Sequence, residues 1–385
     1  SGGSRSVVLD TKGLEISESS PADVFIVIPS QTYKGGLTVE VDTYTEKITK
    51  TVSSDLTFER SQIRAIKDFV LDSEVPDIIP EAIPDNEIWY VSTDGSKIQI
   101  YDNANFGANV IEHTYENGKG IIRFDGPVIN LDYMYGNLSK VILPKKIERI
   151  INNPFNNCPT LSEIISDMAT EDGRCLIMNG KIHSFASYGI EEYVTPAGAV
   201  STAENAFANA QSLKKIVISE GFETLGPSTF AHNTKLEEVY LPSTLKKVES
   251  YAFGWCPSIK KFHGNTDFVS DDGYAVLVRN YNGFAGTFMV AFAAGSGLVS
   301  YTIPDGVTAI ENYTFCEVES LTSITFSEPM TYFGSDAFYM TNNIEYMEGP
   351  DVLDDNRSLV VNGILSYVAD KGISKYEVPE GVTKI

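Results

Sequence analysis

The chain has 385 residues, of which 52 are acidic and 29 are basic, so its formal net charge is -23. Nucleic-acid binding requires a basic face, and this charge therefore excludes a polyanion as the obvious ligand. No run of 18 apolar residues occurs, so no segment is predicted to span a membrane. Four cysteines in a chain of this length do not make a disulfide framework.

Residues 1–72 contain short alternating apolar runs separated by Gly, Asp, Ser and Pro, the pattern of an antiparallel β-sandwich. The stretch VIPSQTYKGGLTVEVDT, residues 27–43, resembles the later strands of fimbrillin-like sandwich domains. We therefore expect a small β-sandwich-like domain over residues 1–72. The first residues, SGGSRS, contain neither a Met nor a signal peptide, so we expect an export signal, with or without a lipid anchor, to lie upstream.

A proline-rich segment follows this region. Pro76, Pro80 and Pro84 fall within nine residues, which predicts a stiff, extended linker over residues 73–86. Residues 87–124 then show hairpin patterns. We expect them to cap the N-terminal end of a repeat array, because its first coil would otherwise expose apolar surface.

Residues 125–385 are predicted to form a mainly β solenoid of 23-residue repeats. Apolar residues recur at repeat positions 1, 4, 6, 10, 13 and 18, and several copies have Pro at position 7, where a strand would end. Such a repeat can bury its apolar residues only against the next copy of itself, so the coils must stack in parallel. The regular copies begin at Leu138, Ile190, Leu213, Leu236, Leu298 and Leu321.

Three copies are interrupted by insertions. The copies at Leu161 and Ile344 are each followed by 29 residues before the next start, and the copy at Ile259 by 39. The first two insertions carry Asn179-Gly180 and Asn362-Gly363 between apolar runs, which is the strongest short-range signal of a hairpin. The third carries Asp272-Gly273 and Asn282-Gly283. All three are predicted to be hairpins extruded from one edge of the solenoid.

The frame LxxIxIPxxVxxIxxxxFxxC, with its DG…NG hairpins, resembles the BspA-like leucine-rich repeats of bacterial surface and secreted proteins, many of them of Bacteroidetes type. The resemblance covers residues 121–385. It implies a right-handed leucine-rich solenoid on an exported protein, at the outer surface of a Gram-negative bacterium or released from it. It implies binding or adhesion, no reaction and no cofactor.

Repeat position 21 varies among the copies. Cys158 and Cys256 fit the resemblance there, and both are expected to be buried thiols rather than disulfide partners or metal ligands. Other copies have different residues, which puts a continuous ladder of side-chain contacts in question: Ala210, Asn233, Val318 and Thr341.

The outward-facing positions of the first strand are the first candidate surface. Positions 2 and 3 alternate between Glu pairs and Lys pairs in four consecutive coils, which favours self-pairing that sets the register over a ligand site. Position 5 is apolar where polar residues are expected. Either β-branched residues simply suit strands, or the row is a patch for a protein or glycan partner. The row consists of Ile142, Ile165, Val194, Val217, Tyr240 and His263.

A Gly-rich hairpin beginning at Arg279 is the second candidate surface, and it carries Tyr281, Phe284, Phe288 and Phe292. These aromatic side chains could stack on sugars or enter a groove of a partner. They could equally fold back on the flank of the solenoid, and the sequence leaves both interpretations open.

Catalytic motifs are not found in the sequence. The four histidines have no metal-ligand spacing, and neither a P-loop nor a nucleophile motif occurs. The turn at Asp271, Asp272 and Gly273 could hold calcium, but Asp-Gly is first a turn former. We predict no enzyme activity, no metal and no cofactor. The predicted function is extracellular recognition or adhesion, with a structural subunit of a fimbria-like assembly as the alternative.

The C-terminal end of the sequence is a partial repeat. The last copy begins at Ile373 and stops at Ile385, before its Phe. An uncapped coil presents an open strand edge, so we expect either further chain or self-association at this edge.

Overall fold

The computed structural model describes residues 83–264, 267–380 and 382–385, together with four short N-terminal strands. The chain divides into two compact units, Ser1–Ser73 and Glu74–Ile385. Two antiparallel pairs are described in the first unit, β1 with β4 and β2 with β3. Their bounds are Thr32–Tyr33 (β1), Leu37–Asp42 (β2), Lys47–Val52 (β3) and Leu56–Thr57 (β4). The remainder of the predicted sandwich and most of the predicted linker lie outside the described residues.

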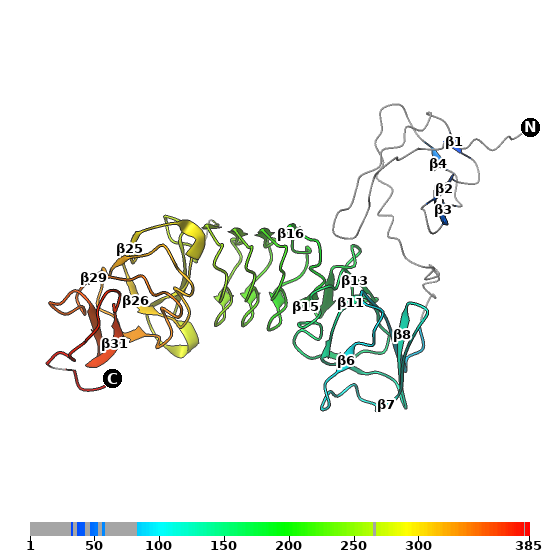
Figure 1. Ribbon diagram of the computed structural model, residues 1–385, viewed down its shortest axis with the longest axis horizontal. Helices are drawn as coiled ribbons and strands as arrows, with labels where there is room; N and C mark the ends of the chain where they lie inside the picture. Colours follow the sequence, from blue (N-terminus) through cyan, green and yellow to red (C-terminus); the bar gives the residue numbers. More distant parts are fainter. Residues whose placement is uncertain are drawn as a thin grey trace, which may run out of the picture. The chain divides into compact units, whose positions relative to one another are not determined.

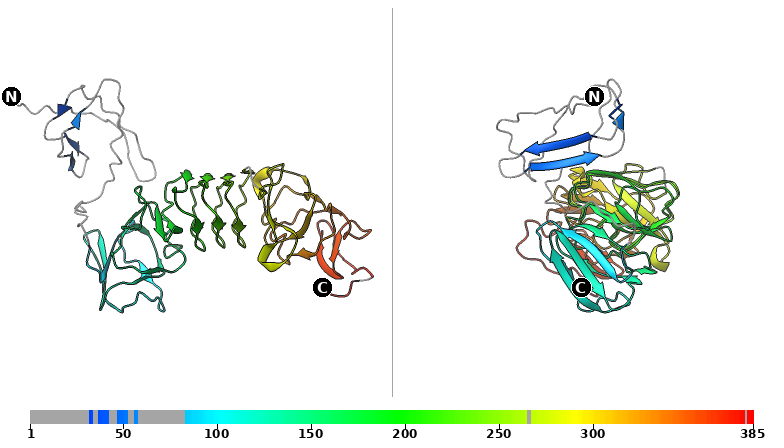
Figure 2. Two further views of the ribbon diagram at one scale, coloured as in Figure 1. Left: turned by 180° about the vertical axis from the view of Figure 1, so that it is seen from behind. Right: turned by 90° about the vertical axis from the view of Figure 1, so that its right-hand side faces the viewer.

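The second unit is a stack of coils with almost no helix in the described residues, which confirms the mainly β solenoid. Two short 3-10 helices occur there, η1 (Tyr281–Gly283) and η2 (Ala294–Ser296). Each regular coil has a first strand at repeat positions 3–5 and a second strand near positions 12 and 13. The two sets of strands run along two sides of the stack (Figure 1), and Figure 2 shows the coils from behind and along their length. No helix in the described part has the length and hydropathy of a membrane span.

The first strands pair in parallel with equal repeat positions opposite each other, as the repeat predicts. They form three separate groups. The first group is β11 (Leu138–Ile142) and β13 (Glu163–Ile165). The second is β16 (Glu192–Val194), β18 (Lys215–Val217), β20 (Glu238–Tyr240) and β22 (Lys261–His263). The third is β25 (Ser300–Thr302), β27 (Ser323–Thr325) and β29 (Tyr346–Glu348).

The second strands form a second set of parallel ladders. One ladder joins β9 (Asn130–Leu131) and β12 (Arg149–Ile150). Another joins β17 (Ser201–Thr202), β19 (Thr224–Leu225) and β21 (Lys247–Val248). A third joins β26 (Val307–Ile310) and β28 (Tyr332–Phe333).

The three predicted hairpins are present as antiparallel pairs. They are β14 (Cys175–Met178) with β15 (Lys181–Phe185), β23 (Ala275–Arg279) with β24 (Thr287–Phe292), and β30 (Ser358–Val361) with β31 (Ile364–Val368). At the first turn Asn179 and Gly180 have φ of 52° and 73°, as a type I′ turn requires.

None of the three hairpins is simply extruded from an edge, which corrects the prediction from sequence. Strand β15 pairs in parallel with β17, β24 pairs in parallel with β26, and Ile364 at the start of β31 forms a parallel bridge with Lys384. The second strand of each hairpin therefore takes the place of the second strand of its own coil. In the second hairpin, the turn is a longer loop around η1 rather than a two-residue turn at Asn282-Gly283.

A column of phenylalanine rings from position 18 lies at the centre of the regular coils. Phe207, Phe230 and Phe253 are buried, with ring centroids 5.3 Å and 5.4 Å apart. The side chain at position 21 ties each ring's backbone to the next coil where it can donate a hydrogen bond. Asn233 donates to the Phe207 carbonyl, and Cys256 donates to the Phe230 carbonyl. The ladder is interrupted at Ala210 and Val318, which have no such donor.

The N-terminal end of the stack is covered by antiparallel strands β5 (Glu87–Ser92), β7 (Val110–Glu116) and β8 (Lys119–Phe124). Strand β5 pairs with the free edge of β11, so the first coil has a covered edge. A further pair joins β6 (Gln99–Ile100) and β10 (Met134–Tyr135).

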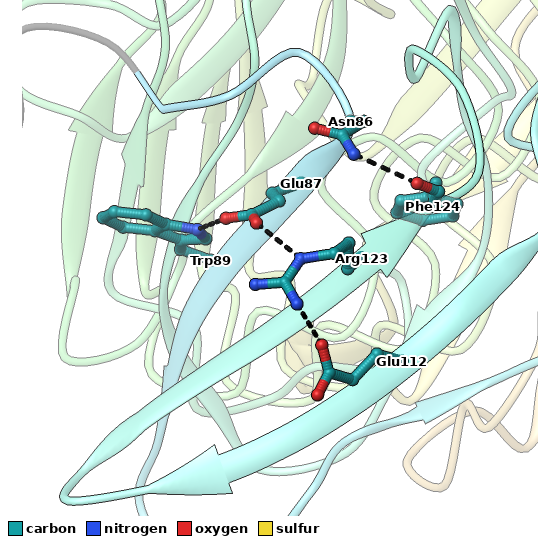
Figure 3. A network of polar contacts seen from close by, with 6 residues as sticks. All are labelled: Asn86, Glu87, Trp89, Glu112, Arg123 and Phe124. Atoms are coloured by element: carbon teal, nitrogen blue, oxygen red, sulfur yellow. Dashed lines mark hydrogen bonds and ion pairs between the residues drawn. The ribbon is translucent and has the colours of Figure 1, made fainter.

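A polar network joins the strands of this end (Figure 3). The Glu87 carboxylate accepts hydrogen bonds from Trp89 Nε1 at 2.6 Å and Arg123 Nε at 2.8 Å. Arg123 also pairs with Glu112. Burial opposes ionisation of Glu87, but these donors outweigh it and hold the pKa of this carboxyl below its ordinary value. The network links all three strands.

Candidate interaction surface

The predicted outer row at position 5 is present, but it is broken. Ile142 lies opposite Ile165, and Val194, Val217, Tyr240 and His263 follow one another in adjacent strands. Strand β13 does not pair with β16, so Ile165 and Val194 are not neighbours in one sheet. The row is therefore not the single patch that the sequence suggested, and it consists of two segments.

The turn that precedes each hairpin causes the break. The Ile164 N–H donates to the Gly173 carbonyl, and the Phe262 N–H donates to the Gly273 carbonyl, both at 2.8 Å. These bonds occupy the strand edge that the next coil would otherwise use. Gly273 has a φ of +75°, and a Cβ added to it would lie 3.0 Å from the Phe262 carbonyl oxygen. A glycine is therefore required for this close approach.

The segment on β16, β18, β20 and β22 is the longer of the two, and we call it the outer row. Val194 is 60% exposed, and the rings of Tyr240 and His263 stack with centroids 4.3 Å apart. The Tyr240 hydroxyl donates to Glu238 Oε2 at 2.9 Å, and this bond is the main reason that the pKa of Tyr240 is raised. The His263 Nε2 atom is buried without a hydrogen-bond partner among the described residues.

Ion pairs flank the outer row, in the alternation that the sequence predicts. Lys214 pairs with Glu191 at 2.9 Å, and Lys260 pairs with Glu237 at 2.7 Å. The Lys215 ammonium lies 5.5 Å from the centre of the Tyr240 ring. Exposed pairs of this kind contribute about 0.2–1 kcal/mol each, so they align the strands more than they stabilise them.

The second candidate surface, the aromatic hairpin, is mostly part of the core. Tyr281, Phe288 and Phe292 are buried, and only Phe284, at 67% exposure, is available to a partner. The reason is that β24 takes the place of the second strand of its coil, so its side chains face the core. Phe292 packs against Phe315, the position-18 ring of the next coil, with ring centroids 4.9 Å apart, and Phe288 packs on Tyr281 at 5.4 Å. A contact role for these three buried rings is thus contradicted.

The acidic turns have their own structural role. Asp272 Oδ1 accepts hydrogen bonds from Ser270 Oγ at 2.6 Å and from the Tyr274 N–H at 2.9 Å. Asp172 accepts equivalent bonds from the Thr170 hydroxyl and the Arg174 N–H. Within the described residues, no group of three or more His, Cys, Asp or Glu side chains is placed to hold a metal.

All four cysteines are free and buried, as expected for Cys158 and Cys256. Burial raises the pKa of the Cys158, Cys175 and Cys256 thiols to about 12. Burial likewise raises the pKa of Cys316 to about 11. These thiols are therefore protonated at neutral pH.

Residues that the sequence analysis did not single out lie where a hairpin replaces part of a coil. In the coil at Ile259, Phe292 at the end of β24 occupies the place of the position-18 ring, and the usual surface turn before it is absent. Rings of the coils on either side meet across this gap, with Trp255 4.6 Å from Tyr313. We call this cluster the aromatic joint, and it comprises His232, Tyr251, Trp255, Tyr313 and Tyr339.

The first hairpin coil, at Leu161, has the same missing turn but different chemistry. The Asn153 Nδ2 atom donates to the Asn205 carbonyl at 2.8 Å, and Asn152 Nδ2 donates to Glu204 Oε2 at 2.8 Å. Asn209 Nδ2 lies 3.4 Å from Asn156 Oδ1. We call this cluster the asparagine joint. The signal in the sequence for both joints was the residue types at repeat positions 15, 16, 19 and 20.

The comparison with known families agrees with the repeat pattern. A model of the BspA type leucine rich repeat region matches residues 131–260 and 289–359 in six copies, just over half of the chain. The chain belongs to the BspA-type leucine-rich repeat family. The unmatched stretch between the two ranges contains β23, the first strand of the second hairpin. No curated protein matches the chain.

Several solved structures are similar to this BspA-type chain. A leucine rich cell surface protein from Faecalibacterium prausnitzii is 16% identical, with 80% of this chain and 85% of that chain covered and a TM-score of 0.49. A leucine-rich repeat protein from Bacteroides ovatus is 20% identical over 66% and 70% of the two chains, with a TM-score of 0.37. The pneumococcal vaccine antigen PcpA is 19% identical over 62% and 59%, with a TM-score of 0.42. These scores lie below 0.5, so the functional argument depends on this chain's own surfaces.

Proposed function

We propose that this protein is a non-catalytic extracellular recognition protein that binds a partner protein through the outer row. Val194, Val217, Tyr240 and His263 form an apolar and aromatic row along four hydrogen-bonded strands, and this is the observation on which the proposal rests. A contiguous apolar patch on a solvent-exposed face is typical of an interaction site. BspA-like repeats are typical of bacterial surface and secreted proteins, which supports the extracellular location.

The surroundings of the outer row support a protein partner. The apolar row lies beside the Lys214–Glu191 and Lys260–Glu237 ion pairs. An apolar centre with a charged rim is the usual organisation of a protein interface. The row is built on short strands in fixed register, so little backbone ordering would be required on binding.

The test uses substitutions that change the outer row and leave the core intact. Purified protein is titrated against an array of immobilised extracellular-matrix and cell-surface proteins, and against a glycan array in parallel. Val194→Lys and Tyr240→Ala should each weaken binding about tenfold or more, because aromatic side chains near the centre of an interface contribute most. Thr325→Ala is the matched control, since Thr325 has the same repeat position on β27.

The outcomes separate the alternatives. Unchanged binding in both variants, with unchanged circular dichroism, would remove the outer row as the contact surface. Binding confined to glycans would contradict a protein partner. A mass that grows with concentration in light scattering would favour the alternative of a structural subunit in a surface array. Protease treatment of intact cells, followed by immunoblotting, tests the extracellular location.

A further inference from the structure

The aromatic joint is a continuous surface cluster of rings from separate coils. His232 stacks on Trp255 with centroids 4.7 Å apart and planes 16° apart. Trp255 contacts Tyr313 at 4.6 Å, and Tyr313 contacts Tyr339 at 5.3 Å. His232 is exposed, Tyr339 is 43% exposed, and the rings between them are half-buried. A partner can therefore reach most of the cluster.

The backbone at this cluster does not explain the choice of aromatic residues. His232, Tyr251, Trp255 and Tyr313 all have left-handed φ values, between 54° and 62°. This conformation costs a bulky residue about 1–2 kcal/mol, whereas Asn adopts it more readily. In the coil at Ile190 the corresponding positions are indeed asparagines, with φ of 60°.

Bridging the missing turn does not explain the aromatic residues either. The asparagine joint spans an equivalent gap with hydrogen bonds from Asn152 and Asn153, and it uses no aromatic ring for this. The same chain therefore solves the same packing problem with residues that suit the backbone. The rings of the aromatic joint require another reason.

The polar atoms of the cluster are available for a ligand. The hydroxyls of Tyr251, Tyr313 and Tyr339 and the indole N–H of Trp255 have no hydrogen-bond partner within the described chain. Tyrosine and tryptophan with a free polar tip are typical of recognition surfaces, where one end packs and the other binds.

The charge around the cluster is negative. Glu317 lies in the same surface turn as Tyr313. Asp336 lies beside the cluster, because its carbonyl accepts a hydrogen bond from the Tyr313 N–H at 3.0 Å. Burial first, and then the charge of Asp336, raise the pKa of Tyr313. The turn segments 249–255, 311–317 and 334–340 contain no Lys or Arg. Ring faces and carboxylates both attract a cation, and the net charge of -23 attracts a basic partner from a distance.

We propose that the aromatic joint is a docking site for a basic, arginine-containing segment of a partner protein. A guanidinium is planar, stacks on aromatic rings and forms paired hydrogen bonds with a carboxylate, so it matches the rings and Glu317 together. The proposal depends on the proposed function only in that the partner is a protein. The surface itself lies at repeat positions 16–20, apart from the outer row at position 5.

The experiment uses Trp255 as its own reporter. The chain has two tryptophans, so Trp89→Phe leaves Trp255 as the single emitter. The variant is titrated with acetylated hexa-arginine, hexa-lysine and the neutral sugar cellohexaose. We expect a saturable change in Trp255 emission with hexa-arginine at a concentration at least fivefold lower than with hexa-lysine, and none with cellohexaose.

Charge-neutral substitutions separate the site from general attraction to an acidic protein. Trp255→Asn with Tyr313→Asn should weaken binding of labelled hexa-arginine at least tenfold, and Tyr339→Asn alone should weaken it severalfold. Asn209→Ala, at the matching position of another coil, and Tyr240→Ala, in the outer row, should leave it unchanged. Tyr339→Asn keeps the test informative if the double variant does not fold.

Three results would overturn the proposal. Equal hexa-arginine binding by the parent and the Asn variants would mean that net charge alone attracts the peptide. Unchanged Trp255 emission at saturation would place the peptide elsewhere. A response to cellohexaose and none to the peptides would make the joint a sugar site. Loss of partner binding in Tyr240→Ala with normal hexa-arginine binding would separate this site from the outer row.

Discussion

The two joints of the solenoid have the same geometry and opposite chemistry. In each, a hairpin strand takes the place of a wall strand, β15 in one and β24 in the other, and a surface turn is lost. The first gap is bridged by buried and half-buried asparagine amides, and the second by half-exposed aromatic rings. Different residue types can therefore occupy these turns, provided that the coils on either side of the gap remain in contact.

This difference indicates a structural role for the asparagine joint and leaves the aromatic joint for recognition. Asn153 is buried and forms three hydrogen bonds, so the asparagine joint depends on it. Trp255 is half-buried, and its indole N–H has no hydrogen-bond partner within the described residues, so this N–H is available to a ligand. The predictions below test this contrast.

The largest effect should be the protection of the thiols, which report on the two joints separately. Cys158 lies two residues after Asn156 of the asparagine joint, and Cys256 directly follows Trp255 of the aromatic joint. The Cys316 N–H donates to the Tyr313 carbonyl at 3.2 Å, so Cys316 also lies at the aromatic joint. At pH 8 alkylation by iodoacetamide should be at least about a thousandfold slower than in urea, because it requires local opening. Mass spectrometry of the labelled peptides measures each site. Rapid labelling of Cys316 alone would show that the aromatic joint opens readily.

The next effect should come from Asn153→Ala. Its amide donates to the Asn205 carbonyl, and its Oδ1 accepts from the Phe155 N–H and from the Ser184 hydroxyl. The substitution leaves buried polar groups unpaired, so we expect the free energy of unfolding to fall by about 3 kcal/mol. Urea unfolding measures the change. Asn156→Ala is the control and should cost less than about 0.5 kcal/mol, since its side chain accepts one long bond; equal losses would contradict the asparagine joint.

Lowering the pH should have opposite effects through Asp172, in the hairpin turn beside the asparagine joint, and through Glu311, a buried carboxyl beside the aromatic joint. Burial opposes ionisation of Asp172, but hydrogen bonds from Thr170, Arg174 and Tyr193 outweigh it and lower the pKa of Asp172. The stabilisation by ionised Asp172 is therefore present above the ordinary Asp range and is lost as pH falls through the folded pKa. Burial raises the pKa of Glu311, so its penalty appears as pH rises through the folded value.

Two variants measure these contributions. At pH 7, Glu311→Gln should raise the free energy of unfolding by about 1 kcal/mol, because Glu311 is buried. Asp172 is exposed and its charge is screened by solvent, so Asp172→Asn should lower the free energy of unfolding by less, about 0.5 kcal/mol. Both differences from the parent protein should shrink as the pH is lowered to 3. Urea unfolding at each pH checks them, and a Glu311→Gln variant that is less stable at pH 7 would contradict the assignment.

The smallest effect on stability should come from Trp255→Asn. The lost ring contacts with His232 and Tyr313 are each worth about 0.5–1.5 kcal/mol, and relief of the left-handed backbone at φ 54° offsets much of this. We expect a net change within about 1 kcal/mol in urea unfolding. A loss as large as that of Asn153→Ala would show that the rings are structural and would remove the contrast between the joints.

Several features of this protein follow from its sequence alone. The spacing of apolar residues predicts the first strands, the parallel register and buried residues such as Phe230 and Phe253, because each depends only on equal positions in neighbouring copies. Asn179-Gly180 and Asn362-Gly363 predict their hairpins, because a local turn needs only its own backbone preferences. The Glu and Lys pairs at positions 2 and 3 predict their own ion pairs for the same reason.

Only the tertiary structure decided where the regular stack is interrupted. Gly173 and Gly273 take the strand edges that would have extended the outer row, and β24 turns Phe288 and Phe292 into core residues. The contact between Trp255 and Tyr313 crosses a coil that has lost its turn. The repeat period predicts contacts between one coil and the next coil in the sequence. The contacts named here depend instead on which strand takes each position in the parallel ladder of second strands. That choice is settled by the packing of the whole stack.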